Sequence, residues 1–536
     1  MEIAARVVSS VVGRASTSQD SQNGAKPAVG KVVDVSDAAF IGGFIPSIID
    51  KQQYPYSRPD FLFFTDDDIS LSCDHTIRPI ITPKHPEKMP LFAGYAEVIN
   101  AGKSKLNEDQ GSARMLYLVQ QGRDAEAAIE LDRQRQRRDG RETQTEDDPL
   151  LTPGTDDSDS SQICISRVEA ALFSLYDGHA GPSAAVLASK CYHEHLKSRL
   201  AKVIDAIISL DKQESQTYTK RSESSYSFTS KLDNMARIRS EQLVCGALET
   251  SFVDMDEQIG DDKQVWRLPG GCAAISVLVL LGKLYVANAG DCRAILVTSE
   301  GTRPLSKDMT PASERKRLQE LAYQCPELVG SSFSRLEYSR RLTRRDLNTT
   351  VLFRDWFMDG WSAKTVKESD LKPPLISETS KKKRLLNTIG VSRGFGDHHL
   401  LTVDDRLSIK PFLSPVPEIS IIDLRDLDIL SDKDVVIMAS DGLWDVISNE
   451  DAGLIVRSVL GSSEPSDPLR YTLAAQELVQ AARGFPAERS NRWIMSGGGH
   501  ASCDDITVFI IPLKYCAAPP TNFEEDDDDE EMINLE

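Results

Sequence analysis

The chain has 536 residues, of which 40% are hydrophobic, so it can bury a large core and, by length, form about two to four domains. Its formal net charge of −20 argues against general nucleic-acid binding. The nine cysteines include no Cys-x-x-Cys pair, which disfavours a disulfide framework or a zinc site and favours a reducing, intracellular compartment. No run reaches the ~18 apolar residues of a membrane span, so we expect a soluble or peripheral protein in the cytoplasm.

Residues 1–14 carry their apolar side chains on one helical stripe, formed by Ile3, Val7, Val8, Val11 and Val12. This pattern is typical of an amphipathic helix that lies on a membrane surface, which would make the protein peripheral on internal membranes. A frayed terminus is an open alternative, and Glu2 disfavours a mitochondrial targeting segment.

Composition predicts the domain limits. Residues 15–90 are rich in Ser, Asp, Pro and Gly, so we read residues 1–90 as an N-terminal extension. Residues 91–515 are expected to form the main folded domain, interrupted by a disordered, highly charged loop at residues 121–161. The acidic run within residues 516–536 predicts a disordered tail.

Several strand-like apolar runs end beside carboxylates. The run before Asp177 is followed by Gly178 and His179, and the run before Asp441 is followed by Gly442. Glu108 and Asp109 follow another strand-like stretch, and Asp504 and Asp505 precede the apolar run 506–511. One Asp-Gly pair is as well explained by a turn, but carboxylates gathered in one pocket would repel each other without cations. The series therefore predicts a metal site.

Residues 275–281 and 284–288 read as a hairpin around Gly282-Lys283, for which we expect a type II′ turn. The second strand leads into another carboxylate at a glycine bend, Asp291. Because strands outnumber crossover helices, we expect antiparallel sheets.

Helical patterns follow in four places. One stripe begins after Gly181-Pro182 and continues to Ile207, and the others span about 241–259, 448–451 onward and 471–483. His193 and His195 fall within the first helix and are expected to be ordinary surface histidines.

Residues 303–384 differ from the rest, with 18 Lys plus Arg against 11 Asp plus Glu, a balance of +7. We expect a helix with Thr310 as its N-cap, and aromatic residues lie later in the segment. A basic, aromatic insertion could receive an anionic protein surface, or it could be a solvated lobe with its own core. The run Lys381–Arg384 is interpreted as ordinary surface.

The motifs occur in a recognisable order. They are Asn107-Glu108-Asp109, Asp177-Gly178-His179-Ala180-Gly181, Gly271-Cys272-Ala273-Ala274, Asn288-Ala289-Gly290-Asp291, Ser392-Arg393-Gly394-Phe395-Gly396-Asp397, Ser440-Asp441-Gly442 and Cys503-Asp504-Asp505. This series resembles the PPM family, the type-2C metal-dependent protein serine/threonine phosphatases. The chain is most similar to the H/J/M branch, through Arg78-Pro79-Ile80, residues 94–104 and residues 354–361. The resemblance implies an α+β fold, a β-sandwich of two antiparallel sheets flanked by α-helices, with residues 303–384 as a flap beside the active site.

The resemblance also implies roles for single residues. Asp177 corresponds to a carboxylate that bridges two metal ions, Gly178 to a carbonyl ligand, and Asp441 and Asp504 to ligands of one ion. The other expected ligands are Glu108, with Asp109 behind it, and Asp291 at a third, looser position. All-oxygen ligands suit Mg²⁺ or Mn²⁺, in a set of two ions or, as an alternative, three.

Two residues are expected to act on the substrate. His179 resembles the family's general acid, which would protonate the leaving alkoxide; the alternative is simple packing at the strand end. The family's phosphate-binding Arg is replaced by Ser104, so we expect Lys103, or alternatively Lys105, to contact the phosphate. Asp505 replaces a usual Asn and should matter little if it faces away from the ions.

These expectations give a function. The chain is predicted to hydrolyse phosphoserine and phosphothreonine in proteins by attack of a metal-activated water. The H/J/M resemblance suggests phosphorylated Rab GTPases as substrates. A homodimer is a further expectation. The alternative is a catalytically silent scaffold that binds phosphoproteins through the same fold.

Overall fold

The computed structural model describes residues 58–119, 167–221, 238–266, 270–377, 382–427, 430–487 and 492–516. The candidate membrane helix at residues 1–14, the charged loop at residues 121–161 and the acidic run of the tail lie outside the described residues. Within the described ranges, every helix is too short or too polar to cross a membrane.

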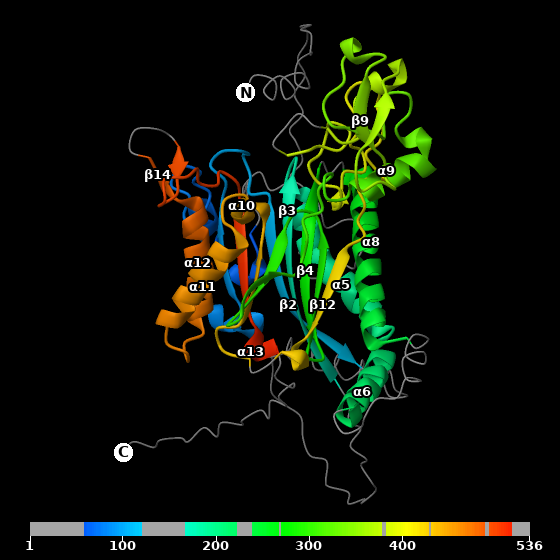
Figure 1. The fold of residues 1–536 in the computed structure, drawn as a ribbon. Coiled ribbons are helices and arrows are strands. Elements are labelled where there is room, and N and C mark those ends of the chain that lie inside the picture. The colour runs from blue at the N-terminus through cyan, green and yellow to red at the C-terminus, as the bar shows by residue number, and fades with distance from the viewer. Residues whose placement is uncertain are drawn as a thin grey trace, which may run out of the picture. The chain divides into compact units, whose positions relative to one another are not determined.

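Two antiparallel sheets form the centre of the fold (Figure 1). The first has the order β1 (Gly94–Val98), β16 (Ile506–Pro512), β13 (Val435–Ala439), β6 (Arg293–Thr298) and β7 (Gly301–Pro304). The second has the order β12 (Glu418–Asp423), β5 (Lys283–Ala289), β4 (Gly271–Leu280), β3 (Arg167–His179) and β2 (Asp109–Val119), and the short β11 (Phe395–Gly396) pairs with β4. All residues of β4 and β5 are buried, which explains why these strands read as continuous apolar runs.

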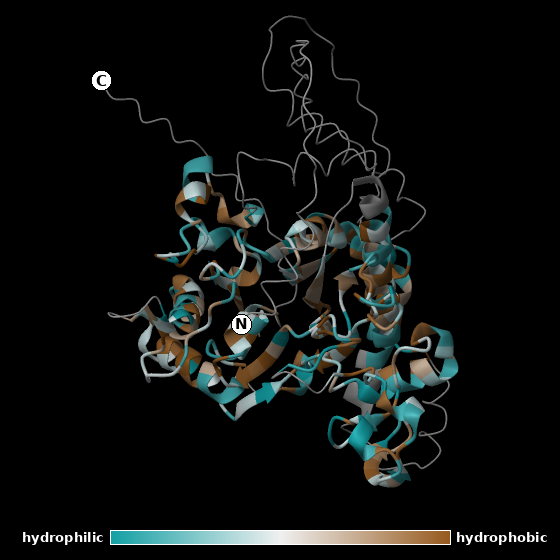
Figure 2. Cartoon of the chain, turned by 90° about the horizontal axis from the view of Figure 1, so that it is seen from above, coloured by the Kyte–Doolittle hydropathy of each residue, from teal (hydrophilic) through white to brown (hydrophobic). Residues whose placement is uncertain are grey.

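The two sheets pack face to face through apolar side chains. Tyr95 and Phe509 of the first sheet meet Phe173 of the second, with ring centroids 4.7 Å apart for Tyr95–Phe509 and 5.9 Å apart for Phe173–Phe509. Seen from above, the central strands are largely hydrophobic (Figure 2). Burial of this shared face holds the ends of the two sheets in a fixed relation.

Helices cover the outer face of each sheet. The second sheet packs against α5 (Ser183–Ala201), α6 (Ile204–Arg221) and α8 (Ser240–Trp266). The first packs against α11 (Asn449–Ser462) and α12 (Leu469–Arg483). The short helices α10 (Asp441–Trp444) and α13 (Leu513–Cys516) follow β13 and β16. The predicted sandwich flanked by helices is confirmed.

The N-terminal segment 58–93 packs on the sandwich. It contains α3 (Asp66–Leu71) and the 3-10 helices η2 (Asp60–Leu62), η3 (Pro86–Lys88) and η4 (Pro90–Phe92). Arg58 donates a 2.6 Å hydrogen bond to the buried Glu97 carboxylate on β1, and Phe61 packs edge-on against Tyr95. These residues belong to the core of the sandwich. The predicted limits of extension and catalytic domain stay predictions.

The flap, residues 303–384, has its own small cores. It contains α9 (Arg315–Gln324) and a three-stranded sheet of β8 (Glu337–Tyr338), β9 (Thr350–Arg354) and β10 (Ser362–Thr365), with the 3-10 helices η5 (Pro326–Leu328), η6 (Arg344–Asp346) and η7 (Glu368–Leu371). In Figure 1 it stands in yellow-green beside the edge where β3 ends and α10 begins.

Three local predictions were wrong. The hairpin loop is Leu281-Gly282, and since both residues have positive φ (50° and 71°) the turn is of type I′. The helix expected from Thr310 begins only at Arg315, because Thr310 caps a single turn that ends at Glu314. The long stripe after Gly181 is divided into α5 and α6, which break at residues 202–203.

The remaining elements lie near the C-terminus of the described chain. They are η8 (Leu424–Asp426) and a two-stranded ribbon of β14 (Phe485–Pro486) and β15 (Trp493–Ile494). The ribbon leads into the segment that carries Asp504.

Candidate metal centre and active site

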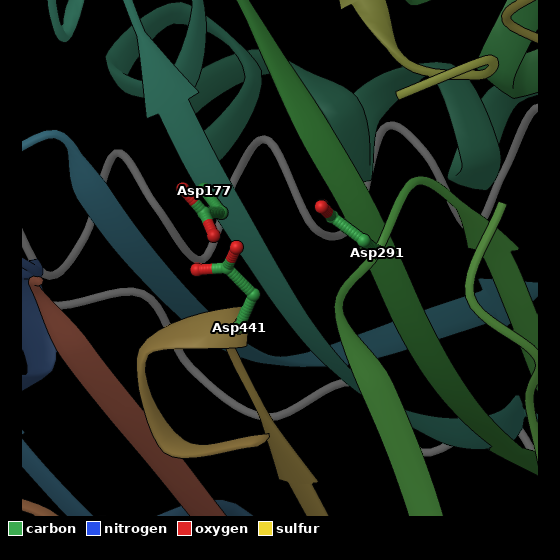
Figure 3. A group of neighbouring side chains, drawn as sticks. All are labelled: Asp177, Asp291 and Asp441. Atoms are coloured by element: carbon green, nitrogen blue, oxygen red, sulfur yellow. The ribbon is translucent and has the colours of Figure 1, made fainter. Parts of the chain in front are cut away.

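Three carboxylates from distant parts of the chain meet at one edge of the sandwich (Figure 3). Asp177 lies near the end of β3, Asp441 begins α10 directly after β13, and Asp291 lies in the bend between β5 and β6. One oxygen from each lies within 4.8 Å of the others. The three side chains point toward one another, so the structure brings these predicted residues together.

Burial makes this cluster unfavourable for ionised groups. Desolvation, reinforced by the neighbouring Asp109 and Asp441, raises the pKa of Asp177 well above its ordinary value. Desolvation and Asp441 raise the pKa of Asp291 to about 7. Partly buried oxygen donors that repel each other fit a hard divalent cation such as Mg²⁺ or Mn²⁺. The oxygen donors of this cluster therefore fit the expected Mg²⁺ or Mn²⁺ ions.

Asp109 lies behind Asp177, as its cross-strand partner on β2. Its carboxylate is buried and accepts a 2.7 Å hydrogen bond from the Ser440 hydroxyl, at the residue before Asp441. Burial and the neighbouring Asp505 raise the pKa of Asp109 well above its ordinary value. Asp109 thus joins the two sheets directly behind the cluster.

Gly178 and Glu108 fix the approach between β2 and β3. The Gly178 N–H donates a 3.1 Å hydrogen bond to the Glu108 carbonyl, and a Cβ at position 178 would lie 2.6 Å from that oxygen. Only glycine permits this close approach. The Glu108 carboxylate accepts a 2.7 Å hydrogen bond from the Gly181 N–H, so it lies at the entrance to α5.

Asp504 and Glu108 stand outside the group of three carboxylates that lie within 4.8 Å. Asp504 forms an ion pair with Lys103, from the loop between β1 and β2. Burial would lower the pKa of Lys103, but the charges of Asp504, Asp441 and Asp177 raise it above its ordinary value. Lys103 therefore lies close to the acidic cluster. The choice between Lys103 and Lys105 as phosphate contact stays a prediction.

The loop that carries Lys103 is held by Asp505. The Asp505 carboxylate accepts hydrogen bonds of 2.7 Å from the Asn100 N–H and 3.1 Å from the Glu108 N–H. The Ser104 hydroxyl donates to the Leu106 carbonyl over 2.6 Å, so it is used within the loop. Asp505 faces this loop, and its role is to hold the loop in place.

Arg78 is a positioning residue that the sequence reasoning missed. Its side chain is fully buried and donates to the Ile99, Ser502 and Asp504 carbonyls over 2.7, 2.7 and 2.8 Å. It therefore ties the N-terminal segment to the main chain of a predicted metal ligand. The Arg78-Pro79-Ile80 phrase in the extension was the available signal.

His179 lies at the end of β3 and is hydrogen-bonded to Asp397. The distance from Nε2 to Oδ2 is 2.6 Å. Burial would lower the pKa of His179, but the hydrogen bond and charge of Asp397 raise it above its ordinary value. A Cβ at Gly271 would lie 2.4 Å from the Asp397 carboxylate, so glycine makes room for the pair.

A buried carboxylate supports this pair from behind. Asp256 on α8 accepts a 2.7 Å hydrogen bond from the Gly396 N–H and also contacts His398 and Lys410. Gly396 precedes Asp397, so Asp256 holds the segment that orients His179. The sequence reasoning gave Asp256 and Asp397 no role, because the contacts join distant segments.

Lys382 is a further residue that the sequence reasoning missed. Its ammonium lies 2.7 Å from the Asp441 carboxylate and 2.9 Å from that of Asp445. Lys382 is at the surface, as interpreted, with 54% of its side chain exposed, but nothing in the sequence indicated its contact with Asp441. A basic run cannot show by itself which surface it faces.

Comparisons with known proteins agree with this geometry. The sequence model described as "Protein phosphatase 2C" matches residues 132–351 and 373–487. "Protein phosphatase 1H" of Homo sapiens is 40% identical over 484 residues, 86% of this chain and 91% of that protein. "Protein phosphatase 1M" of Mus musculus is 40% identical over 465 residues (86% and 92%), and "Protein phosphatase 1J" of Mus musculus is 37% identical over 466 residues (85% and 86%). With the sandwich and its acidic cluster, these matches show that the chain belongs to the protein phosphatase 2C (PPM) family and is a protein serine/threonine phosphatase.

Proposed function

We propose that the protein hydrolyses phosphoserine and phosphothreonine with a water molecule activated by divalent ions at the cluster of Asp177, Asp291 and Asp441. The observation that carries this proposal is the convergence of three partly buried carboxylates from β3, α10 and the β5–β6 bend. When bound, Mg²⁺ or Mn²⁺ would supply charge neutralisation and a nucleophilic water at neutral pH. Side-chain nucleophiles are not required.

The chain's own residues would divide the work of holding these ions. Asp177, the Gly178 carbonyl and Glu108 lie at or next to the ends of β3 and β2, and Asp441 and Asp504 lie next to the ends of β13 and β16; together they would hold the ions. Asp291 would complete the looser third position, and Asp109 supports Asp177 from behind. Two ions are the proposed minimum and three the alternative.

Substrate binding and proton transfer would fall to two further residues. Lys103 lies beside Asp504 and would bind a phosphate oxygen as a point charge. His179, oriented by Asp397 with a raised pKa, would carry the proton that the departing Ser or Thr alkoxide needs.

We also propose that the flap binds anionic protein surfaces, with phosphorylated Rab GTPases as one substrate class. A flap pocket of about 460 Å³ supports this proposal, because its lining includes Arg340, Arg341, Lys372 and Arg384. Removal of the whole flap would be a poor test, since Glu314 of the flap pairs with Arg393 of the body over 2.6 Å.

Point substitutions in the pocket give a sharper test of the flap. The double variant Arg341→Glu/Lys372→Glu should lose at least about 10-fold in kcat/KM on a phosphorylated Rab and little on an aryl phosphate. The matched control is Lys316→Gln, an exposed flap lysine paired with Asp359. Equal losses on both substrates would contradict flap docking.

Membrane contact through residues 1–14 and homodimerisation also belong to the proposal. Deletion of residues 1–14 should leave aryl phosphate hydrolysis intact and abolish co-sedimentation with anionic vesicles. Unchanged sedimentation would remove the membrane part. The molar mass from light scattering decides the oligomeric state.

The enzyme proposal competes with a silent scaffold that binds phosphoproteins. The test is hydrolysis of an aryl phosphate with and without Mn²⁺, in the wild type and in Asp441→Ala. We expect turnover that depends on Mn²⁺ and is abolished by the substitution, with an unchanged circular dichroism spectrum. Absence of turnover in a wild type that binds Mn²⁺ would favour the scaffold.

A further inference from the structure

Lys382 belongs to the flap, but its side chain lies beside carboxylates of the body of the protein. Its ammonium contacts both Asp441 and Asp445, over 2.7 and 2.9 Å. Asp441 is one of the three clustered carboxylates. The contact joins an inserted segment to the proposed site of hydrolysis.

The main chain after Lys382 is fixed to the flap. Lys383 pairs over 3.0 Å with the buried Glu337, which also accepts a 2.6 Å hydrogen bond from Arg354. The Ser377 N–H donates to the Arg384 carbonyl over 2.8 Å. Lys383 thus pairs with Glu337 of the flap, whereas its neighbour Lys382 pairs with Asp441 of the body. The contacts of residues 383 and 384 with the flap therefore fix the main chain so that Lys382 lies beside Asp441.

The side chain of Lys382 is accessible to solvent. It is 54% exposed and the Asp445 side chain is 50% exposed, so the pair with Asp445 is weak in solvent, whereas the Asp441 side chain is 17% exposed. A divalent ion at Asp441 would compete with the ammonium for the same carboxylate oxygens. Repulsion between the like charges would then move Lys382 outward, onto the side from which a phosphate approaches.

A phosphate bound at this site would need cationic side chains to contact its oxygens. The arginine that the family resemblance leads one to expect is Ser104 here, and its hydroxyl is bonded within its own loop. Lys103 provides a single ammonium on the Asp504 side. A phosphate with three free oxygens has room for a second cationic contact, from a lysine beside Asp441.

We propose that Lys382 is a phosphate-contacting residue delivered by the flap, which rests on Asp441 and Asp445 until divalent ions and substrate displace it. The inference rests on the proposed metal-dependent hydrolysis. It makes the flap part of the phosphate subsite, in addition to its proposed docking role.

Isothermal titration of the full chain tests the inference without relying on turnover. Lys382→Gln should bind Mn²⁺ about 2- to 10-fold more tightly, because a competing charge is gone. With Mn²⁺ saturating, it should bind inorganic phosphate about 3- to 30-fold more weakly. Lys382→Arg should keep most of the phosphate affinity. Lys316→Gln, an exposed flap lysine paired with Asp359, is the matched control and should match the wild type.

The outcomes separate this inference from the proposed function. If Lys382→Gln binds phosphate as the wild type does, Lys382 is only a resting ion pair and the inference is overturned, while Mn²⁺-dependent aryl phosphate hydrolysis can still stand. If the wild type shows no Mn²⁺-dependent hydrolysis, the proposed function fails first. A steady-state readout agrees with the inference only if KM for a phosphopeptide rises more than kcat falls.

Discussion

The hydrogen bond between His179 and Asp397 gives the sharpest prediction about the mechanism. The two side chains are 2.6 Å apart, and Asp397 is buried, so the bond is charge-assisted whenever His179 is protonated. Asp397→Asn keeps the shape of the side chain and removes the charge. A hydrogen bond to a charged group contributes about 1.5–3 kcal/mol, which corresponds to about 10- to 150-fold in rate.

The assay compares two leaving groups. An alkoxide from phosphothreonine needs a proton as it departs, whereas an acidic phenol from an aryl phosphate does not. We therefore expect Asp397→Asn to lower kcat on a phosphothreonine peptide by about 10- to 150-fold, and kcat on the aryl phosphate by much less. His179→Asn should show the same asymmetry with a larger loss, of about 10²- to 10⁴-fold on the peptide.

A matched control separates chemistry from folding. His195 on α5 also makes a short hydrogen bond, 2.7 Å to Gln258, and lies outside the acidic cluster. His195→Asn should leave both activities unchanged. Equal losses on peptide and aryl phosphate in Asp397→Asn would refute the proton-transfer reasoning and leave the pair a packing role at the end of β3.

Three further predictions concern stability and the carboxylate cluster. Burial would raise the pKa of Glu314, but its ion pairs with arginines lower it to about 2 from 4.5. Glu314→Gln should therefore lower the free energy of unfolding in urea by about 2–3 kcal/mol at pH 7. This loss should shrink as the pH falls from 4.5 toward 2, and the control Glu327→Gln, at an exposed residue, should change stability little. Burial raises the pKa of Asp291 to about 7, so its ionised form disfavours folding above that pH; Asp291→Asn should raise the melting temperature of chelator-treated protein at pH 8, and a lower melting temperature would contradict the repulsion argument. Gly178→Ala would place a methyl group 2.6 Å from a carbonyl oxygen and should reduce both melting temperature and Mn²⁺-dependent activity, whereas an unchanged enzyme would show that the β2–β3 approach is not constrained.

Much of the sandwich could be predicted from the sequence because its signals are local. The apolar runs before Asp177 and Asp441 are strands, and both carboxylates lie where a strand ends. Alternation and Asp-Gly turns are properties of a few adjacent residues. The order of these motifs along the chain indicated the family, and the family resemblance implied two antiparallel sheets flanked by helices.

The wrong or missing predictions arose where a local pattern fits two structures, or where contacts with distant segments determine the structure. A glycine in a two-residue loop suits both I′ and II′ turns, and the pairing of Leu280 with Lys283 settled the choice by fixing Leu281 and Gly282 as the loop. Thr310 caps one turn and not the following helix. Arg78 gave no sign of burial, since its acceptors are carbonyls that lie up to 426 positions away in the chain.

The same distance in sequence explains how the fold holds carboxylates that repel each other. The clustered aspartates lie in or next to different strands, and these strands are held by apolar faces buried between the two sheets. Packing of the apolar faces thus opposes the repulsion between the carboxylates. A cation that relieves this repulsion binds more tightly for that reason. Without cations, Lys103 beside Asp504 and Lys382 beside Asp441 partly neutralise the negative charge of these carboxylates. A chain that replaced the clustered aspartates with asparagines should gain stability and lose its affinity for divalent ions, because both properties have the same electrostatic origin.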